Sequence, residues 1–194
     1  MCTESYRDMI LSFDTSGPYC AAALLDGETV LAARAEPMKR GQAERLLPLL
    51  EDLLAEAGTG WKDVTRIGVG TGPGNFTGIR IAVATARGLA LGLKIPAVGV
   101  TTFEVIRATS DAAIAAVPAT GGLFYLQHAD GTITQSAEIP GGAATAADDA
   151  AANAATIAGV AAGKPTDTRP APLYVRAADA APSSEAAPVI LDDA

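Results

Sequence analysis

The residues best suited to chemistry follow the first apolar run of the chain. Asp14, Thr15 and Ser16 come directly after MILSF. An aspartate at the end of a strand can hold a metal ion that is bound to phosphates, and a hydroxyl can contact a phosphate oxygen. The alternative is an Asx-type turn, in which the carboxylate accepts a hydrogen bond from the backbone two residues on. The residue types alone leave both interpretations open.

A second candidate is the stretch GTGPGNFTGIR, residues 70–80, which lies between an apolar run and a helical pattern. It matches neither standard phosphate motif, because Thr77 stands where the dinucleotide fingerprint needs a third glycine and no lysine supplies a P-loop. Gly72, Gly74 and Asn75 can still present backbone N–H groups to an anion. The alternative is a tight turn where a strand and a helix touch.

The remaining reactive residue types are few and scattered. The two cysteines, Cys2 and Cys20, form no CxxC spacing, and the single histidine, His128, follows an expected strand with no serine or cysteine elbow. Neither a zinc site nor a Ser-His-Asp set can be assembled from them. We therefore predict no catalytic residues, no metal ligands and no cofactor that the chain holds by itself.

Length, charge and hydropathy limit the classes of protein that fit. The 194 residues suffice for one medium domain or two small ones, and 49% of them are hydrophobic. The net charge of −8 disfavours direct binding of nucleic acid, since an acidic surface repels phosphate backbones. The N-terminal residues show no signal-peptide pattern, and we expect a cytoplasmic protein with no membrane partner.

The pattern of apolar residues predicts the order βββαβαβα, which matches a ribonuclease-H-like mixed sheet. The expected strands are 9–17, a hairpin over 19–36 with its turn at Asp26-Gly27, 66–72 and 94–100, and the expected helices are 41–57, 77–93 and 101–117. Pro48 within the first helix predicts either a later start or a kink.

The later part of the sequence is less well specified. We place a domain boundary after residue 104, giving a first domain of residues 1–104 and a smaller, degenerate second domain of residues 105–194. A hairpin is expected around Asp130-Gly131. The alanine-rich residues 141–165 fit either a helix packed by alanines or a loose segment. A final extended stretch is expected over residues 170–182.

Two of the expected helices carry more apolar surface than a single sheet contact needs. The first has a leucine face, and the second has apolar residues on more than one side. This surplus suggests a second contact, either within the chain or with a partner.

Several stretches together resemble a known family. FDTS, ERLLPLLEDLL, GVGTGPGNFTGIRIAVATARGLALGL, IPAVGVTTFE and PLYVRAADAAP stand in the order found in the TsaB (YeaZ) family of bacterial tRNA threonylcarbamoyladenosine biosynthesis. The resemblance implies an α/β fold of the actin-like, Hsp70-like ATPase class. It also implies a non-catalytic scaffold for the synthesis of N6-threonylcarbamoyladenosine at tRNA position 37. The scaffold binds and stabilises the catalytic subunit TsaD, and the ATPase TsaE joins them.

The resemblance assigns the partner contact to the two apolar helices. The residues that we expect to make it are Leu46, Leu50, Leu53, Gly78, Ile79, Ala82, Val83 and Ala86. Leu46→Glu or Ile79→Glu is then expected to abolish the complex without unfolding the chain. ADP or ATP is possible at the partner interface, and a homodimer can form through the same helices when the partner is absent.

Two points qualify the family interpretation. Asn75 replaces the serine that is usual in the family loop, and its amide should preserve the turn. The alternative function is a nucleotide-binding transferase or kinase-like enzyme of the same fold. That enzyme would use Asp14, Ser16 and the loop from Gly72 to Gly74.

Overall fold

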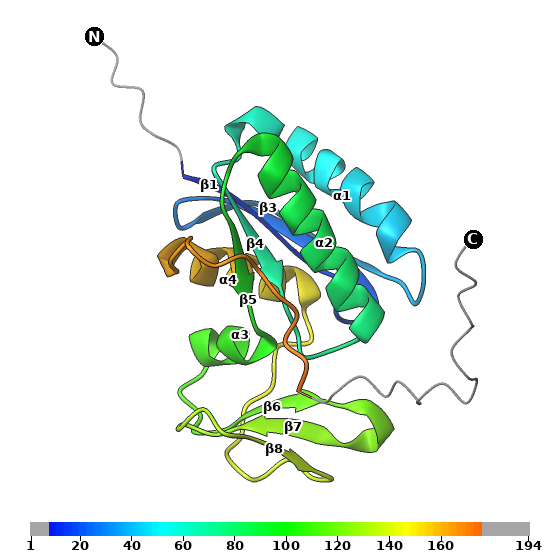
Figure 1. Ribbon diagram of the computed structural model, residues 1–194, viewed down its shortest axis with the longest axis vertical. Coiled ribbons are helices and arrows are strands. Elements are labelled where there is room, and N and C mark those ends of the chain that lie inside the picture. Colours follow the sequence, from blue (N-terminus) through cyan, green and yellow to red (C-terminus); the bar gives the residue numbers. More distant parts are fainter. Residues whose placement is uncertain (1–7, 176–194) are drawn as a thin grey trace, which may run out of the picture.

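A five-stranded mixed sheet forms the centre of the molecule, of which our computed structural model describes residues 8–175 (Figure 1). The strand order is β3-β2-β1-β4-β5, with β2 antiparallel to both neighbours and β4 and β5 parallel to β1. The strands are β1 (Met9–Asp14), β2 (Tyr19–Asp26), β3 (Thr29–Pro37), β4 (Arg66–Gly70) and β5 (Ala97–Val100). The predicted ribonuclease-H-like sheet is confirmed.

The alternation of side chains along β1 assigns its two faces. Met9, Leu11 and Phe13 pack into the core under α1 (Gln42–Glu56) and α2 (Phe76–Leu93), whereas Ile10 packs with residues of α4 (Ala150–Gly163). Every residue of this strand is buried, as expected of a central strand with helices on both sides. The sheet is therefore the middle of three layers.

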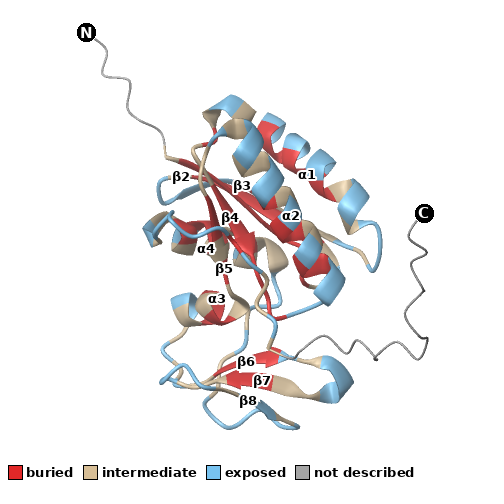
Figure 2. Cartoon of the chain, viewed as in Figure 1, coloured by how far each residue is buried: buried red, intermediate tan, exposed pale blue. Residues whose placement is uncertain are grey.

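Helices α1 and α2 lie side by side on one face of the sheet (Figure 1). Each turns its buried side toward the sheet and an exposed side outward (Figure 2). α1 runs through Pro48, which is exposed, so the helix does not begin there. By length and hydropathy α2 is the one described helix that could cross a bilayer, but its mean hydropathy is only 1.3 and a core helix passes the same test.

The alanine-rich segment forms α4, which covers the opposite face of the sheet. Its Ala154, Ala158 and Ala161 are fully buried, and a Cβ atom at Gly68 of β4 would lie 3.1 Å from that of Ala161. Small residues on both sides thus let the helix approach the strands closely. Of the two alternatives for this segment, the helix packed by alanines is the one observed.

Polar contacts fix α4 against the sheet. The hydroxyl of Ser12 donates to the carbonyl of Ala154 at 2.6 Å. The guanidinium of Arg66 donates to the carbonyls of Ala161 and Ala162 at 2.6 and 2.8 Å. These carbonyls belong to the last turn of the helix, where few backbone donors remain, and Arg66 caps α4 together with the backbone N–H of Lys164, which donates to Ala161 O at 3.3 Å.

A smaller antiparallel sheet lies at one end of the molecule, beside α3 (Thr102–Thr109) (Figure 1). Its strands are β6 (Ala115–Pro118), β7 (Phe124–Gln127) and β8 (Ile133–Ser136), and two short 3-10 turns complete the elements, η1 (Trp61–Asp63) and η2 (Thr120–Gly122). The hairpin at Asp130-Gly131 is confirmed.

The prediction of one helix over residues 101–117 was wrong at its end. A capping box between Thr101 and Glu104 starts α3, but the chain becomes extended at Ser110. Residues 115–118 pair instead with β7 in the smaller sheet. Their short apolar side chains suit either structure, so local pattern did not separate strand from helix.

The predicted division of the chain after residue 104 stays a prediction. However, α4, from the later part of the sequence, packs against all five strands of the first sheet. Lys164, just beyond α4, also binds Glu104 Oε1 at 2.6 Å. Of the expected extended stretch, residues 176–182 lie outside the described residues.

Candidate functional site

The Asp14 carboxylate is occupied by hydrogen bonds from its own neighbourhood. Its Oδ1 accepts from the backbone N–H of Ser16 at 2.9 Å, and its Oδ2 accepts from the hydroxyls of Ser16 and Tyr19 at 2.8 and 2.9 Å. Asp14 and Ser16 are buried, with 8% and 7% of their surfaces exposed. This is the geometry of the Asx-type turn, with Tyr19 as an additional donor.

Tyr19 is suited to remain that donor. Burial raises the pKa of its phenol well above the ordinary value, and the neighbouring Asp14 carboxylate raises it further. The phenol therefore keeps its proton throughout the neutral range. Tyr19 was not among the predicted site residues, although it follows the predicted turn closely in the sequence.

The glycine loop packs against the same turn. A Cβ atom at Gly74 would lie 2.7 Å from the carbonyl oxygen of Ser16, and one at Gly78 would overlap the carbonyl oxygen of Thr15. The backbone N–H of Asn75 donates to Ser16 O at 2.6 Å, and the Thr15 hydroxyl donates to Gly78 O at 2.7 Å. Glycine is needed at these positions because two backbones touch there.

The other side of the loop is held by α3. Thr102 donates its backbone N–H to Gly72 O at 2.8 Å and its hydroxyl to Pro73 O at 3.1 Å. The Gly72-Pro73 peptide is cis, and Gly72 has a φ of +85°. The loop therefore contacts the turn after β1 on one side and the start of α3 on the other. Hydrogen bonds fix both contacts.

Asn75 is the N-cap of α2. Its side-chain oxygen accepts from the backbone N–H of Gly78 at 2.9 Å. The prediction that asparagine would preserve the loop is consistent with this contact. Gly74, Asn75, Phe76 and Thr77 are exposed, and anion binding by the backbone of this loop stays a prediction.

The space beside Asp14 is too small for a nucleotide. A cavity of about 30 Å³ lies between Asp14, Tyr19 and Gly70 on one side and Asn153 of α4 on the other. That volume is roughly the space of one water molecule. In this conformation the described residues offer no room at Asp14 for ATP.

The residues that we assigned to partner binding lie on the inner sides of the two helices, and their role in partner binding stays a prediction. All eight are buried residues of α1 and α2: Leu46, Leu50, Leu53, Gly78, Ile79, Ala82, Val83 and Ala86. Apart from Gly78, each of them is at most 3% exposed. They pack against the chain's own sheet or loop, so Leu46→Glu or Ile79→Glu would unfold the protein rather than release a partner.

The outward face of the two helices carries different residues. Leu47 and Phe76 are 45% and 40% exposed, and Leu91 is 82% exposed. Ala84 and Gly88, which lie between Phe76 and Leu91 in the sequence of α2, are also exposed. We did not assign Leu47 to the partner contact. Its place one residue after Leu46, about 100° further round the helix, was the available signal.

An aromatic cluster joins the start of α2 to the last described residues. The guanidinium of Arg80 lies 3.8 Å from the centre of the Phe76 ring and donates to the Tyr174 hydroxyl at 2.9 Å. The two rings are 5.0 Å apart. Leu173 also donates its backbone N–H to Thr71 O at 2.9 Å. The segment before residue 176 is thereby bound along α2.

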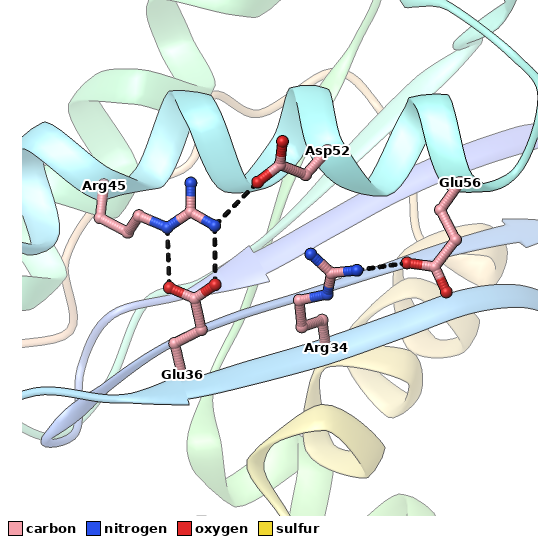
Figure 3. Close-up of polar contacts among 5 residues, drawn as sticks. All are labelled: Arg34, Glu36, Arg45, Asp52 and Glu56. Atoms are coloured by element: carbon pink, nitrogen blue, oxygen red, sulfur yellow. Dashed lines mark hydrogen bonds and ion pairs between the residues drawn. The ribbon is translucent and has the colours of Figure 1, made fainter.

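Charged side chains bind α1 to the edge strand β3 (Figure 3). Arg45 makes a two-pronged ion pair with Glu36, with both N–O distances 2.7 Å, and contacts Asp52 at 2.8 Å. Arg34 pairs with Glu56 at 2.6 Å. The hydrogen bonds from Arg45 lower the pKa of Glu36. The ion pairs with β3 orient α1 on the edge of the sheet.

The side chains that could ligate a metal ion are scattered over the described residues. Between residues 8 and 175, no three His, Cys, Asp or Glu side chains lie close enough to hold a metal ion. His128 directly follows β7 of the small sheet and contacts the Thr134 hydroxyl at 3.0 Å, so it does not belong to the Asp14 turn. Cys20 is a buried free thiol, and burial raises its pKa to about 11.

The strand order, the reversed β2 and the helices on both faces define an α/β protein of the actin-like, Hsp70-like ATPase class. The model of the TsaD family, tRNA N6-adenosine threonylcarbamoyltransferase, matches residues 32–170. The chain belongs to this family.

Relatives within it carry the name that the sequence motifs suggested. The chain is 42% identical over 93 residues to the tRNA threonylcarbamoyladenosine biosynthesis protein TsaB of Escherichia coli, which is 48% of this chain and 40% of that protein. It is 36% identical over 99 residues to TsaB of Bacillus subtilis, 51% of this chain and 43% of that protein. The chain thus spans less than half the length of these relatives. The resemblance to TsaB is confirmed.

A solved structure extends the likeness across the fold. YeaZ from Pseudomonas aeruginosa is 25% identical, with a TM-score of 0.64, and the match covers 87% of this chain and all of that one, 100%. An uncharacterized Mycobacterium tuberculosis protein is 29% identical over 198 residues, 89% of this chain and 94% of that protein. These two matches include the later half of the chain, where the motifs are faint.

Proposed function

We propose that this chain is a non-catalytic subunit in the synthesis of tRNA threonylcarbamoyladenosine, which binds and stabilises the catalytic subunit TsaD. The observation that carries the proposal is the outward face of α1 and α2. It exposes large apolar side chains, Leu47 and Leu91, beside the small residues Ala84 and Gly88. Small residues let the backbone of another helix approach, and apolar neighbours supply the buried area that stabilises a complex.

The closed turn at Asp14 supports the non-catalytic part of the proposal. Its carboxylate oxygens already accept three hydrogen bonds, and the adjacent cavity has about 30 Å³. A transferase or kinase-like enzyme of this fold would need an open nucleotide site there. A nucleotide in the assembly would instead lie at the interface with TsaD. Binding of ATP with Mg²⁺ to the isolated chain, lost in Asp14→Asn, would restore the enzyme hypothesis.

The rest of the proposed assembly follows from charge. With a net charge of −8, this chain is not expected to hold tRNA by itself, so other subunits would do so. TsaE would join as the ATPase of the complex, in the cytoplasm. When TsaD is absent, the same outward face would allow a homodimer, because an isologous contact uses one patch twice.

Co-purification with TsaD from the same organism tests the proposal. Leu47→Glu and Ala84→Arg each place a charge on the exposed face and should each reduce recovery of TsaD at least tenfold. Ala152→Glu is the control, since it adds a charge to the exposed side of α4 on the opposite face. All three variants should keep the unfolding temperature of the wild type within a few degrees.

Two results would contradict the proposal. One is a wild-type chain that does not bind TsaD at micromolar concentration. The other is recovery of TsaD by both α1 and α2 variants at the wild-type level, which would place the contact elsewhere. Light scattering of the chain alone, at several concentrations, separates a monomer from the homodimer, and Leu47→Glu should favour the monomer.

A further inference from the structure

A second recess lies at the end of α2, away from the Asp14 turn. It has a volume of about 680 Å³ and is bounded by the last turns of α2, the start of β5 and the segment after α4. Volumes of this size are typical of sites for small molecules. The polar residues of its lining include Arg87, Lys94, Thr166, Thr168 and Arg169.

The charge of this recess is opposite to that of the chain. Arg87, Lys94 and Arg169 line it, and no acidic residue does. None of the ion pairs found between residues 8 and 175 includes these three cations. In a chain with a net charge of −8, three cations without carboxylate partners around one concavity mark a site for an anion.

The cations come from two segments that are held together. Arg87 lies in α2 and donates its Nε–H to the carbonyl of Pro170 at 2.8 Å, which fixes the segment that carries Arg169. This bond leaves the two terminal nitrogens of Arg87 for a ligand. Thr166 and Thr168 also line the recess, and the Thr168 hydroxyl donates to Asp167 Oδ1 at 3.4 Å. Asp167, which lies between them in the sequence, is not part of the lining.

Stabilisation of the α2 C-terminus is the simpler explanation for Lys94, because cations favour the negative end of a helix. That end is already capped: the backbone N–H groups of Lys94 and Ile95 both donate to Ala90 O. Lys94 has a φ of +58°, a left-handed conformation in which glycine or asparagine is free of strain. The helix dipole gives no reason for Arg169, which belongs to another segment.

We propose that this recess binds a phosphate-bearing small molecule, with Lys94 and Arg169 as the principal contacts. A guanidinium pairs with two phosphate oxygens at once, and an ammonium adds a compact charge. The cations converge on a concavity rather than forming an extended stripe, which favours a small phosphorylated ligand over a nucleic-acid backbone. The inference goes beyond the proposed function and does not depend on TsaD.

Titration calorimetry of the full chain with sodium pyrophosphate tests the site. Pyrophosphate should bind at low ionic strength, and the double variant Lys94→Asn/Arg169→Gln should weaken binding at least tenfold. Asparagine is chosen at position 94 because it tolerates the left-handed conformation. The matched control is Lys39→Gln/Arg40→Gln, which removes two exposed charges before α1 and should leave binding unchanged.

Three outcomes would overturn the proposal. The first is no heat of binding for pyrophosphate at millimolar concentration. The second is an equal loss in the control variant, which would mean a general effect of net charge. The third is binding of a short single-stranded RNA, but not of pyrophosphate, that the double variant abolishes. Circular dichroism melts establish that each variant is folded before titration.

Discussion

The hydroxyl of Thr15 donates a 2.7 Å hydrogen bond to the carbonyl of Gly78, where a Cβ atom would overlap Thr15's own carbonyl oxygen. The end of β1 and the first turn of α2 are thus in backbone contact. This explains why the glycine loop is so rich in small residues without requiring a phosphate. The loop positions α2, and through α2 the outward face that we propose for TsaD.

Gly78→Ala should destabilise the fold strongly. The added methyl group would meet the backbone of Thr15, which cannot rotate away as a side chain can. We expect the free energy of unfolding to fall by about 2–3 kcal/mol, even though alanine favours a helix over glycine by about 1 kcal/mol. Urea denaturation followed by circular dichroism measures the change.

Gly88→Ala provides the matched control in the same helix. No atom lies within 4 Å of the position of its added Cβ. The variant should therefore be as stable as the wild type or more stable, by up to about 1 kcal/mol. Equal effects of the two substitutions would show that close packing of the loop is not what requires Gly78.

Tyr19→Phe should destabilise the fold by removing a donor to Asp14. The phenol donates to Oδ2 at 2.9 Å, and hydrogen bonds to charged groups contribute about 1.5–3 kcal/mol. Because Ser16 still donates to the same oxygen, we expect a loss near the lower end, about 1.5 kcal/mol. Tyr125→Phe, a buried tyrosine of β7, is the comparison and should change stability by less than about 0.5 kcal/mol.

The ion pair between Glu36 and Arg45 should contribute stability that depends on pH. The pKa of Glu36 is lowered in the folded state, so its contribution is present above the unfolded pKa of about 4.5. It is lost as pH falls through the lower folded pKa. Since the side chains are 31% and 30% exposed, solvent screening limits the effect to about 0.5–1 kcal/mol.

Glu36→Gln tests this contribution. The variant should be less stable than the wild type at pH 7, and the two stabilities should converge as pH falls below the unfolded pKa of about 4.5 and through the lower folded pKa. Glu28→Gln, in the exposed turn between β2 and β3, is the control and should show no comparable dependence. A constant difference between Glu36→Gln and the wild type from pH 7 to pH 3 would count against the pair as the cause.

Much of the first sheet was predictable from local signals. The Asp26-Gly27 turn specified the first hairpin, with Gly27 at a φ of +58°, and the apolar runs at 66–70 and 97–100 specified buried parallel strands. The end of α3 was not predictable, because residues 115–118 gain their strand partners from β7 and from Ala144, which both follow later in the chain. Long-range pairing of this kind leaves little trace in a short apolar segment.

The site is harder to predict than the fold, and for a physical reason. Leucines at helical spacing identify an apolar face, but the sequence does not say whether the chain's own sheet or a partner covers it. Leu46, Leu50 and Leu53 were assigned to the partner, and they pack against the chain's own sheet. The recess at Lys94 and Arg169 joins segments about 75 residues apart in sequence, and no local pattern reveals such a pair.

Leu50→Ala and Leu47→Ala should separate the two sides of α1 quantitatively. Leu50 is fully buried, and removing its branched end should cost about 2–5 kcal/mol through lost burial and the cavity that remains. Leu47 is 45% exposed, so its truncation should change the stability of the isolated chain by less than about 0.5 kcal/mol.

The affinity for TsaD should depend on Leu47 instead. Leu47→Ala should weaken association, because a large apolar side chain at an interface contributes more than its effect on the free monomer. Denaturant melts give the first comparison and titration calorimetry with TsaD the second. If Leu47→Ala binds TsaD like the wild type while Leu50→Ala loses both stability and binding, the outward face of α1 is not the contact, and the loss in Leu50→Ala reflects unfolding alone.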